Sequence, residues 1–184
     1  QVRPTRPPHD RTIPIDRPME TRADRALTRR APRRRSGTPQ QSIGHEGLEE
    51  VGYLLAGAGP TPDVLDAIMG VLTVQYGYHQ VSLHLLGDDG VARLAAQRGY
   101  EVAVDFDGTS GVIGRVMRTR EPAFVPNVGL DPDYSAANAE VTGEICIPLL
   151  AQGELLGVLN VESTADQPLE EADRRVVAMV GDRL

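Results

Sequence analysis

The hydrophobic positions between Gly143 and Ser163 form two apolar runs that are joined by a short turn at residues 151–153. Aliphatic side chains fill the odd positions, and most even positions are apolar as well. The odd set is Ile145, Ile147, Leu149, Leu155, Leu159 and Val161. Because both faces are apolar, the pattern predicts two antiparallel central strands covered on both sides, rather than a sheet with one face in water.

Three polar residues, Glu144, Asn160 and Glu162, interrupt the even face of this hairpin. Side chains alternate along a strand, so all three are expected on one face, where convergent polar groups are typical of a small-molecule pocket. A three-residue loop at 151–153 would place Glu144 opposite Asn160. A two-residue loop at 152–153 would slip the register by one and separate the two onto opposite faces.

A carboxylate pair beside an amide suits a ligand with a cationic or donor-rich group, since buried unpaired acceptors cost about 1–3 kcal/mol each. The competing interpretation is that these residues merely finish the strands in solvent.

The remaining periodicities predict an α+β fold, which is an antiparallel sheet of about six strands with helices on both faces. Thr61 and Ser110 are expected helix N-caps, and Pro62 follows Thr61 at the first helical position. The further helices are expected at about 47–56 and from about Leu169, and the further strands at 79–86, 91–97 and 123–126, with a polar loop or short helix at 130–140.

Several segments resemble those of GAF domains over roughly residues 46–184. They read Y-G-Y-H-Q-V-S-L-H-L-L, G-T-S-G-V-I-G-R-V-M-R-T-R-E-P-A-F-V-P-N-V, D-P-D-Y, E-I-C-I-P-L, G-E-L-L-G-V-L-N-V-E-S and P-L-E-E-A-D. The resemblance implies a GAF/PAS-like fold and a sensory or regulatory module. Such modules are usually dimeric and attached to an effector, and this chain looks like those found ahead of diguanylate cyclase or histidine kinase domains.

One enzymatic branch of the GAF family reduces free methionine sulfoxide with two thiols. By resemblance, its cysteines correspond to Ile113 and to the segment 131–137, which holds no cysteine, and its acidic positions correspond to Glu144, Asn160 and Glu162. The chain therefore keeps part of the carboxylate frame without the thiols. The residues that match the cyclic-nucleotide and bilin branches are also largely missing.

Four further positions are candidate ligand contacts beside Ile113. Gly111 would allow a ligand, or equally the sheet, to approach closely. Asp131 and Tyr134 would line a pocket mouth, or form a solvated turn with a packed tyrosine. Cys146 lies inside an apolar run, so we expect a core side chain rather than a nucleophile. No metal site is expected, because the spacing of the histidines does not bring them together as ligands. No cofactor is expected either.

Charge divides the chain into two regions. Residues 1–41 hold 11 arginines, 4 acidic residues and 7 of the 14 prolines, whereas residues 42–184 carry a net charge of −14. The first region is interpreted as a disordered Arg/Pro-rich tail or linker. A basic arm for nucleic acid or anionic lipid is the less favoured alternative, because interleaved aromatic residues are absent.

We therefore expect a non-catalytic sensory GAF domain at 42–184, cytoplasmic, with no membrane span and a last helix cut off at Leu184. It would bind an unknown small molecule, signal to a downstream effector domain in the same polypeptide and form a homodimer through its terminal helices. A divergent free-methionine-sulfoxide reductase and a ligand-free dimerisation module are the alternatives.

Overall fold

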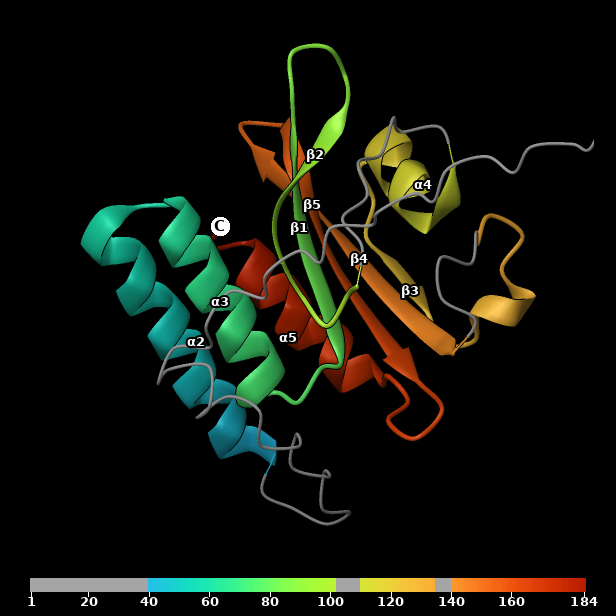
Figure 1. Cartoon of the computed structure of the whole chain (residues 1–184), viewed down its shortest axis with the longest axis horizontal. Coiled ribbons are helices and arrows are strands. Elements are labelled where there is room, and N and C mark those ends of the chain that lie inside the picture. The colour runs from blue at the N-terminus through green and yellow to red at the C-terminus, as the bar shows by residue number, and fades with distance from the viewer. Residues whose placement is uncertain (1–39, 102–109, 135–139) are drawn as a thin grey trace, which may run out of the picture. The chain divides into compact units, whose positions relative to one another are not determined.

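The computed structural model describes residues 40–101, 110–134 and 140–184 (Figure 1). All of these described residues belong to one compact unit, and the fold below is that of this unit. The tail expected at 1–41 lies outside the described residues, apart from its last two positions. No helix in the described part of the chain combines the length and the apolar character needed to cross a bilayer.

Five antiparallel strands form one sheet with the order β2-β1-β5-β4-β3. The strands are β1 (Gln80–Leu86), β2 (Ala92–Arg98), β3 (Ala123–Val125), β4 (Val141–Ala151) and β5 (Glu154–Thr164). The expected antiparallel sheet is confirmed, but the expectation of about six strands was one too many for the described residues. Their apolar runs supply only five strands, and β3 pairs with no more than three residues of β4.

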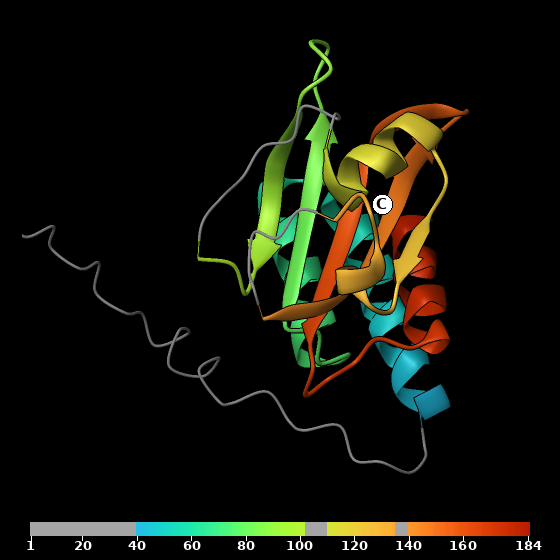
Figure 2. The ribbon, with the colours of Figure 1, turned by 90° about the vertical axis from the view of Figure 1, so that its right-hand side faces the viewer.

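Helices cover both faces of the sheet, as expected. Helices α2 (Gln40–Ala58), α3 (Pro62–Val74) and α5 (Glu171–Gly181) lie on one face, and α4 (Gly111–Thr119) and the 3₁₀ turn η1 (Val128–Leu130) lie on the other (Figures 1 and 2). The odd residues of β4 and β5 pack against α2, α3 and α5. The even residues face α4, where Val112, Ile113 and Val116 pack with Cys146 and Val158.

Thr61 and Ser110 both precede helices, but only one of them caps with its side chain. Thr61 Oγ1 accepts a 3.4 Å hydrogen bond from the backbone N–H of Val64, as its position predicts. Ser110 occupies the N-cap position of α4 without a side-chain hydrogen bond. The next residue, Gly111, has a φ of +73°, which glycine adopts without strain.

A β-bulge sets the register of the central hairpin. The turn has two residues, Gln152 and Gly153, both with positive φ, so Ala151 pairs with Glu154. The register then shifts where Leu149 pairs with Gly157, which leaves Leu156 as the extra residue. The three-residue loop is therefore wrong. The two-residue loop is present, but the bulge shifts the register by one further residue. The even residues of both strands therefore lie on one face.

Gly157 allows the bulged strand to lie close to β1. A Cβ atom at this position would lie 2.2 Å from the backbone oxygen of His84. That distance is far shorter than any real contact, so Leu85 can pair with residue 157 only because that residue is a glycine, without a side chain.

Candidate functional site

The polar residues of the even face meet on the three central strands. Across the β4–β5 ladder Glu144 lies directly opposite Glu162, and Asn160 lies opposite Cys146. On the other side of β5, β1 places Gln80 opposite Glu162 and Ser82 opposite Asn160. The sequence predicted the shared face correctly, but the partner of Glu144 is Glu162 rather than Asn160, because of the bulge.

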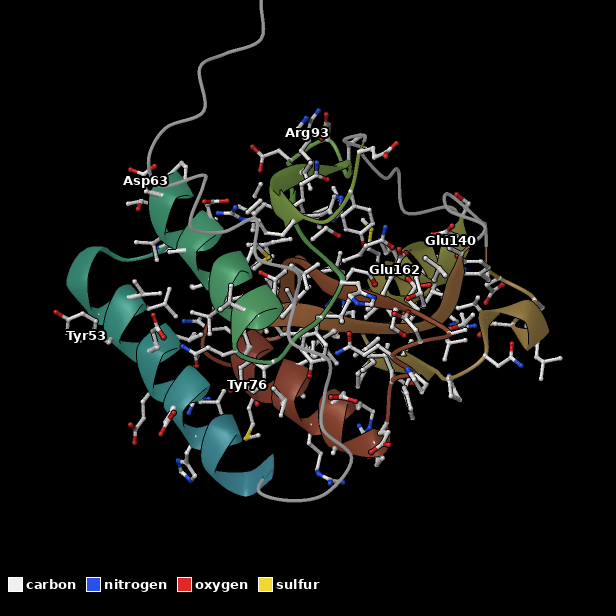
Figure 3. The ribbon with its side chains drawn as sticks, turned by 60° about the horizontal axis from the view of Figure 1, so that its bottom comes forward. Tyr53, Asp63, Tyr76, Arg93, Glu140 and Glu162 are labelled. Atoms are coloured by element: carbon white, nitrogen blue, oxygen red, sulfur yellow. The ribbon has the colours of Figure 1, made fainter. Side chains whose placement is uncertain are left out.

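These side chains are buried. The exposed fraction is 3% for Glu144 and 1% for Asn160, and Glu162 is intermediate between buried and exposed. Figure 3 shows Glu162 on the sheet beside α4. The burial of Glu144 and Asn160 is inconsistent with the interpretation that the three residues simply end the strands in water.

Asn160 connects the two carboxyl groups. With its amide oriented to satisfy both of its polar atoms, Nδ2 donates to Glu144 Oε1 at 3.0 Å and to the backbone oxygen of Ile145 at 3.3 Å. In the opposite orientation of the amide, Nδ2 donates to Glu162 Oε1 at 3.5 Å instead. Glu144, Asn160 and Glu162 therefore form one polar cluster, which we call the carboxyl–amide cluster.

The surroundings of the cluster favour protonated carboxyl groups. Burial, followed by the charge of Glu162, raises the pKa of Glu144 to about 8. Burial also raises the pKa of Glu162, although the polar groups of Tyr100 and Asn160 beside the carboxyl oppose this effect. Both shifts arise because a charge is costly where water is excluded and where a second carboxylate lies nearby.

Tyr100, which follows β2, belongs to the same site and was missed from the sequence. Burial and then the charge of Glu162 raise its pKa well above the ordinary value, and the phenol lies beside Ser82 and Asn160. Although close to these groups, the buried hydroxyl has no hydrogen bond of good geometry, and neither has Oε1 of Gln80. The alternation of Gln80 and Ser82 along the sequence was a usable signal, but the pairing of β1 with β5 was not visible there.

Asp131 and Tyr134 lie near the cluster, where Asp131 acts on Glu144 and both glutamates act on Tyr134. Arg115 connects α4 to the segment that follows η1. Its guanidinium donates to both oxygens of Asp131 at 2.9 and 2.8 Å and to Asp133 at 2.8 Å. The hydrogen bonds from Arg115 lower the pKa of Asp131. Burial and then the charges of Glu162 and Glu144 raise the pKa of Tyr134 to about 12.

The structure places the remaining candidates in or near the core under α4. Cys146 is 0% exposed and packs in the same apolar cluster as Ile113. Burial, followed by the charge of Glu144, raises the pKa of the thiol, which therefore stays protonated and unreactive. Gly111 is not there for close packing, since a Cβ at its position would meet no atom within 4 Å.

Among the described residues, no group of three or more His, Cys, Asp or Glu side chains is placed to hold a metal ion. The carboxyl–amide cluster can instead accept hydrogen bonds from a ligand and neutralise a positive charge. It offers two carboxyl groups and one amide, and Tyr100 adds a hydroxyl.

The GAF domain family model matches residues 60–184. The Nif-specific regulatory protein of Azospirillum lipoferum is 26% identical over 131 residues, which cover 65% of this chain and 21% of that protein. GAF domain-containing protein A of Dictyostelium discoideum is 25% identical over 133 residues, which cover 72% of this chain and 84% of that protein. The chain thus spans about a fifth of the length of the Nif-specific regulators that it matches.

Solved structures share the fold. The free methionine-R-sulfoxide reductase of Neisseria meningitidis, in complex with its substrate, aligns with a TM-score of 0.69 at 21% identity, over 80% of this chain and 92% of that chain. The GAF domain of a phosphoenolpyruvate-protein phosphotransferase from Coxiella burnetii aligns with a TM-score of 0.70 at 21% identity, over 78% and 91%. At this identity the likeness shows the fold alone.

Proposed function

The chain belongs to the GAF domain family, and from this membership and its buried polar site we propose that it is a non-catalytic sensory domain that binds a small molecule. The observation that carries the proposal is the carboxyl–amide cluster on the α4 face of the sheet, in which Glu144 and Asn160 are buried and Glu162 is partly buried. A cluster that only supported the fold would not need two carboxyl groups side by side, because their burial lowers stability.

The chemistry of the cluster favours a ligand with a cationic or donor-rich group. Arg115, the cation that acts on Glu144, is already hydrogen-bonded to Asp131 and Asp133, so it does not neutralise the cluster. Tyr100 and Gln80 each contribute a buried polar atom without a hydrogen bond. A bound ligand would provide the missing partners, each of which is worth about 1–3 kcal/mol. Asp131, Tyr134 and the backbone near Gly111 are further proposed contacts.

We propose that the signal leaves through the terminal helices to an effector domain in the same polypeptide. The effector would be a diguanylate cyclase or histidine kinase, or a regulatory domain as in the Nif-specific regulatory proteins, and the protein would act in the cytoplasm. The proposed dimer would form through α2 and α5, where Tyr53 is 81% and Met179 39% exposed. Figure 3 shows Tyr53 pointing away from α2. Sedimentation of residues 40–184 at micromolar concentration tests the dimer.

The alternative enzyme, a divergent free-methionine-sulfoxide reductase, draws its support from the shared fold. The burial of Cys146 and the presence of Ile113 at the matching position argue for a binding module instead. Turnover of free methionine sulfoxide with a thiol reductant would establish the enzyme and overturn the non-catalytic proposal.

The test of the sensory function is a screen of small cationic metabolites by thermal shift. A ligand should raise the unfolding temperature of the parent chain, and the rise should disappear in the Glu144→Gln/Glu162→Gln double variant. Glu49→Gln, an exposed position on α2, serves as the matched control and should respond like the parent. Equal responses of the parent and the double variant would place the ligand elsewhere.

A further inference from the structure

Glu144 and Glu162 occupy directly opposite positions of the β4–β5 ladder, so their side chains leave the sheet side by side. Residues that face each other in this way have Cβ atoms about 4.5–5.5 Å apart. Glu144 is 3% exposed, so water screens the pair poorly. Two negative charges at this separation would repel each other strongly, which disfavours ionisation of both groups together.

The groups around the pair do not compensate two negative charges. The charged and titratable side chains that act on Glu144 and Glu162 are Tyr100 after β2, Cys146 on β4, Asp131 and Tyr134 near η1, and Arg115 on α4. His84 is further along β1, opposite Val158. Among the described residues that act on the pair, Arg115 is the only cation, and its salt bridges to Asp131 and Asp133 measure 2.8 Å each.

The Asn160 amide has one donor side and one acceptor side, and this arrangement disfavours two ionised carboxyl groups. With Nδ2 donating to Glu144 at 3.0 Å, the amide oxygen faces Glu162 Oε1 at 3.5 Å. An ionised Glu162 would repel the amide oxygen in this orientation, which favours a proton on that carboxyl. With the amide reversed, its oxygen faces Glu144 instead, and the proton is needed there. Either orientation therefore fits one protonated and one ionised carboxyl group.

We propose that Glu144 and Glu162 share one proton in the ligand-free chain, and that a cationic ligand binds in exchange for this proton. On binding, the O–H bond of the protonated carboxyl breaks, the proton passes to bulk water, and both carboxylates face the cation. The exchange rests on the proposed function, whereas the shared proton does not. Ligand affinity would then rise about tenfold per pH unit until the pair is fully ionised.

The shared proton is tested on the ligand-free chain by NMR of ¹³C-labelled glutamate side chains during a pH titration. We expect one carboxyl group of the pair to titrate above pH 7, and the other well below it. In Glu144→Gln or Glu162→Gln, the remaining carboxyl should titrate about one pH unit or more lower than the protonated group of the parent, because the like charge is gone. Glu49→Gln should change neither titration.

Two NMR results would overturn the shared proton. One is the titration of both carboxyl groups below pH 6. The other is a single variant in which the remaining carboxyl titrates as its counterpart does in the parent.

The exchange is tested with methylammonium chloride as the cationic probe and methanol as its neutral counterpart. Calorimetry in two buffers of different ionisation enthalpy counts the protons released. We expect about one proton per bound methylammonium at pH 6.5 and almost none at pH 9.5, with no binding of methanol. Binding without proton release at pH 6.5 would overturn the exchange.

If methylammonium does not bind at any pH, the exchange and the cationic ligand both fail. The NMR titration then still decides the shared proton by itself, so the two failures are distinguishable.

Discussion

The hydroxyl of Tyr78 donates a buried hydrogen bond of 3.1 Å to Oδ1 of Asp173, and Oδ2 of the same carboxylate accepts the backbone N–H of Glu170 at 2.8 Å. Asp173 is 3% exposed and forms the capping box of α5 with Glu170. Tyr78 lies two residues before Gln80, the first residue of β1, which is opposite Glu162. The residue pair therefore connects the polar site to the first turn of the last helix.

Tyr78→Phe should destabilise the fold by about 1–3 kcal/mol, because it removes a hydrogen bond to a buried carboxylate. Urea denaturation measures the loss. Tyr53→Phe is the matched control, since this ring is 81% exposed on α2, and it should lie within about 0.5 kcal/mol of the parent. A loss no larger than that of the control would show that the Tyr78 hydroxyl contributes nothing to the start of α5.

Glu144→Gln should change how stability depends on pH. The pKa of Glu144 rises from its ordinary value of 4.5 to about 8 in the folded chain. Between these values the folded state binds more protons than the unfolded state, so the free energy of unfolding falls as the pH rises, and becomes level above about 8.

The free energy of unfolding of the Glu144→Gln variant, relative to that of the parent, should therefore rise between pH 5 and 8 by up to about 1.4 kcal/mol per pH unit. Denaturation at four pH values measures the difference, with Glu49→Gln as the control. A difference that does not change with pH would contradict the raised pKa of Glu144.

Gly157→Ala should destabilise the chain by more than 2 kcal/mol, because the new Cβ would lie 2.2 Å from a backbone oxygen of β1 and one strand must move. Gly52→Ala is the control, since a Cβ at that position in α2 meets no atom within 4 Å. It should stabilise the helix by roughly 0.5–1 kcal/mol. Thermal or urea unfolding compares the two, and a neutral Gly157→Ala would mean that β1 and β5 are not so close.

Arg115→Ala should raise the pKa of Asp131 toward its ordinary value, because the hydrogen bonds from the guanidinium are the largest cause of the lowered pKa. NMR titration of the Asp131 carboxyl measures the shift. Arg93→Ala removes an exposed ion pair with Asp89 and should leave Asp131 unchanged. If Asp131 titrates alike in both variants, Arg115 does not hold it.

Deletion of residues 1–39 should leave the unfolding temperature within a few degrees of the value for residues 1–184. The expectation comes from the high proline and arginine content of this region and its lack of apolar periodicity. A differential scanning calorimetry trace of each form gives the answer, and a larger drop would show that the tail packs on the domain.

The alternation of side chains was sufficient to predict much of the fold. Ile145, Ile147 and Leu159 identified the central strands, and even numbering placed Glu144, Asn160 and Glu162 on one face. The helix starting after Thr61 was also readable, because its cap and Pro62 act within a few residues. These features could be predicted because the interactions that cause them are local.

The composition of the site depended on tertiary structure. Glu144 faces Glu162 only because a bulge at Leu156 corrects the register of a two-residue turn. Tyr100 and Gln80 join the cluster because β1 pairs with β5, a strand more than 70 residues further along the chain. The energy of such pairing comes from side chains distant in sequence, and a one-residue shift changes every partner, so local pattern alone does not determine it.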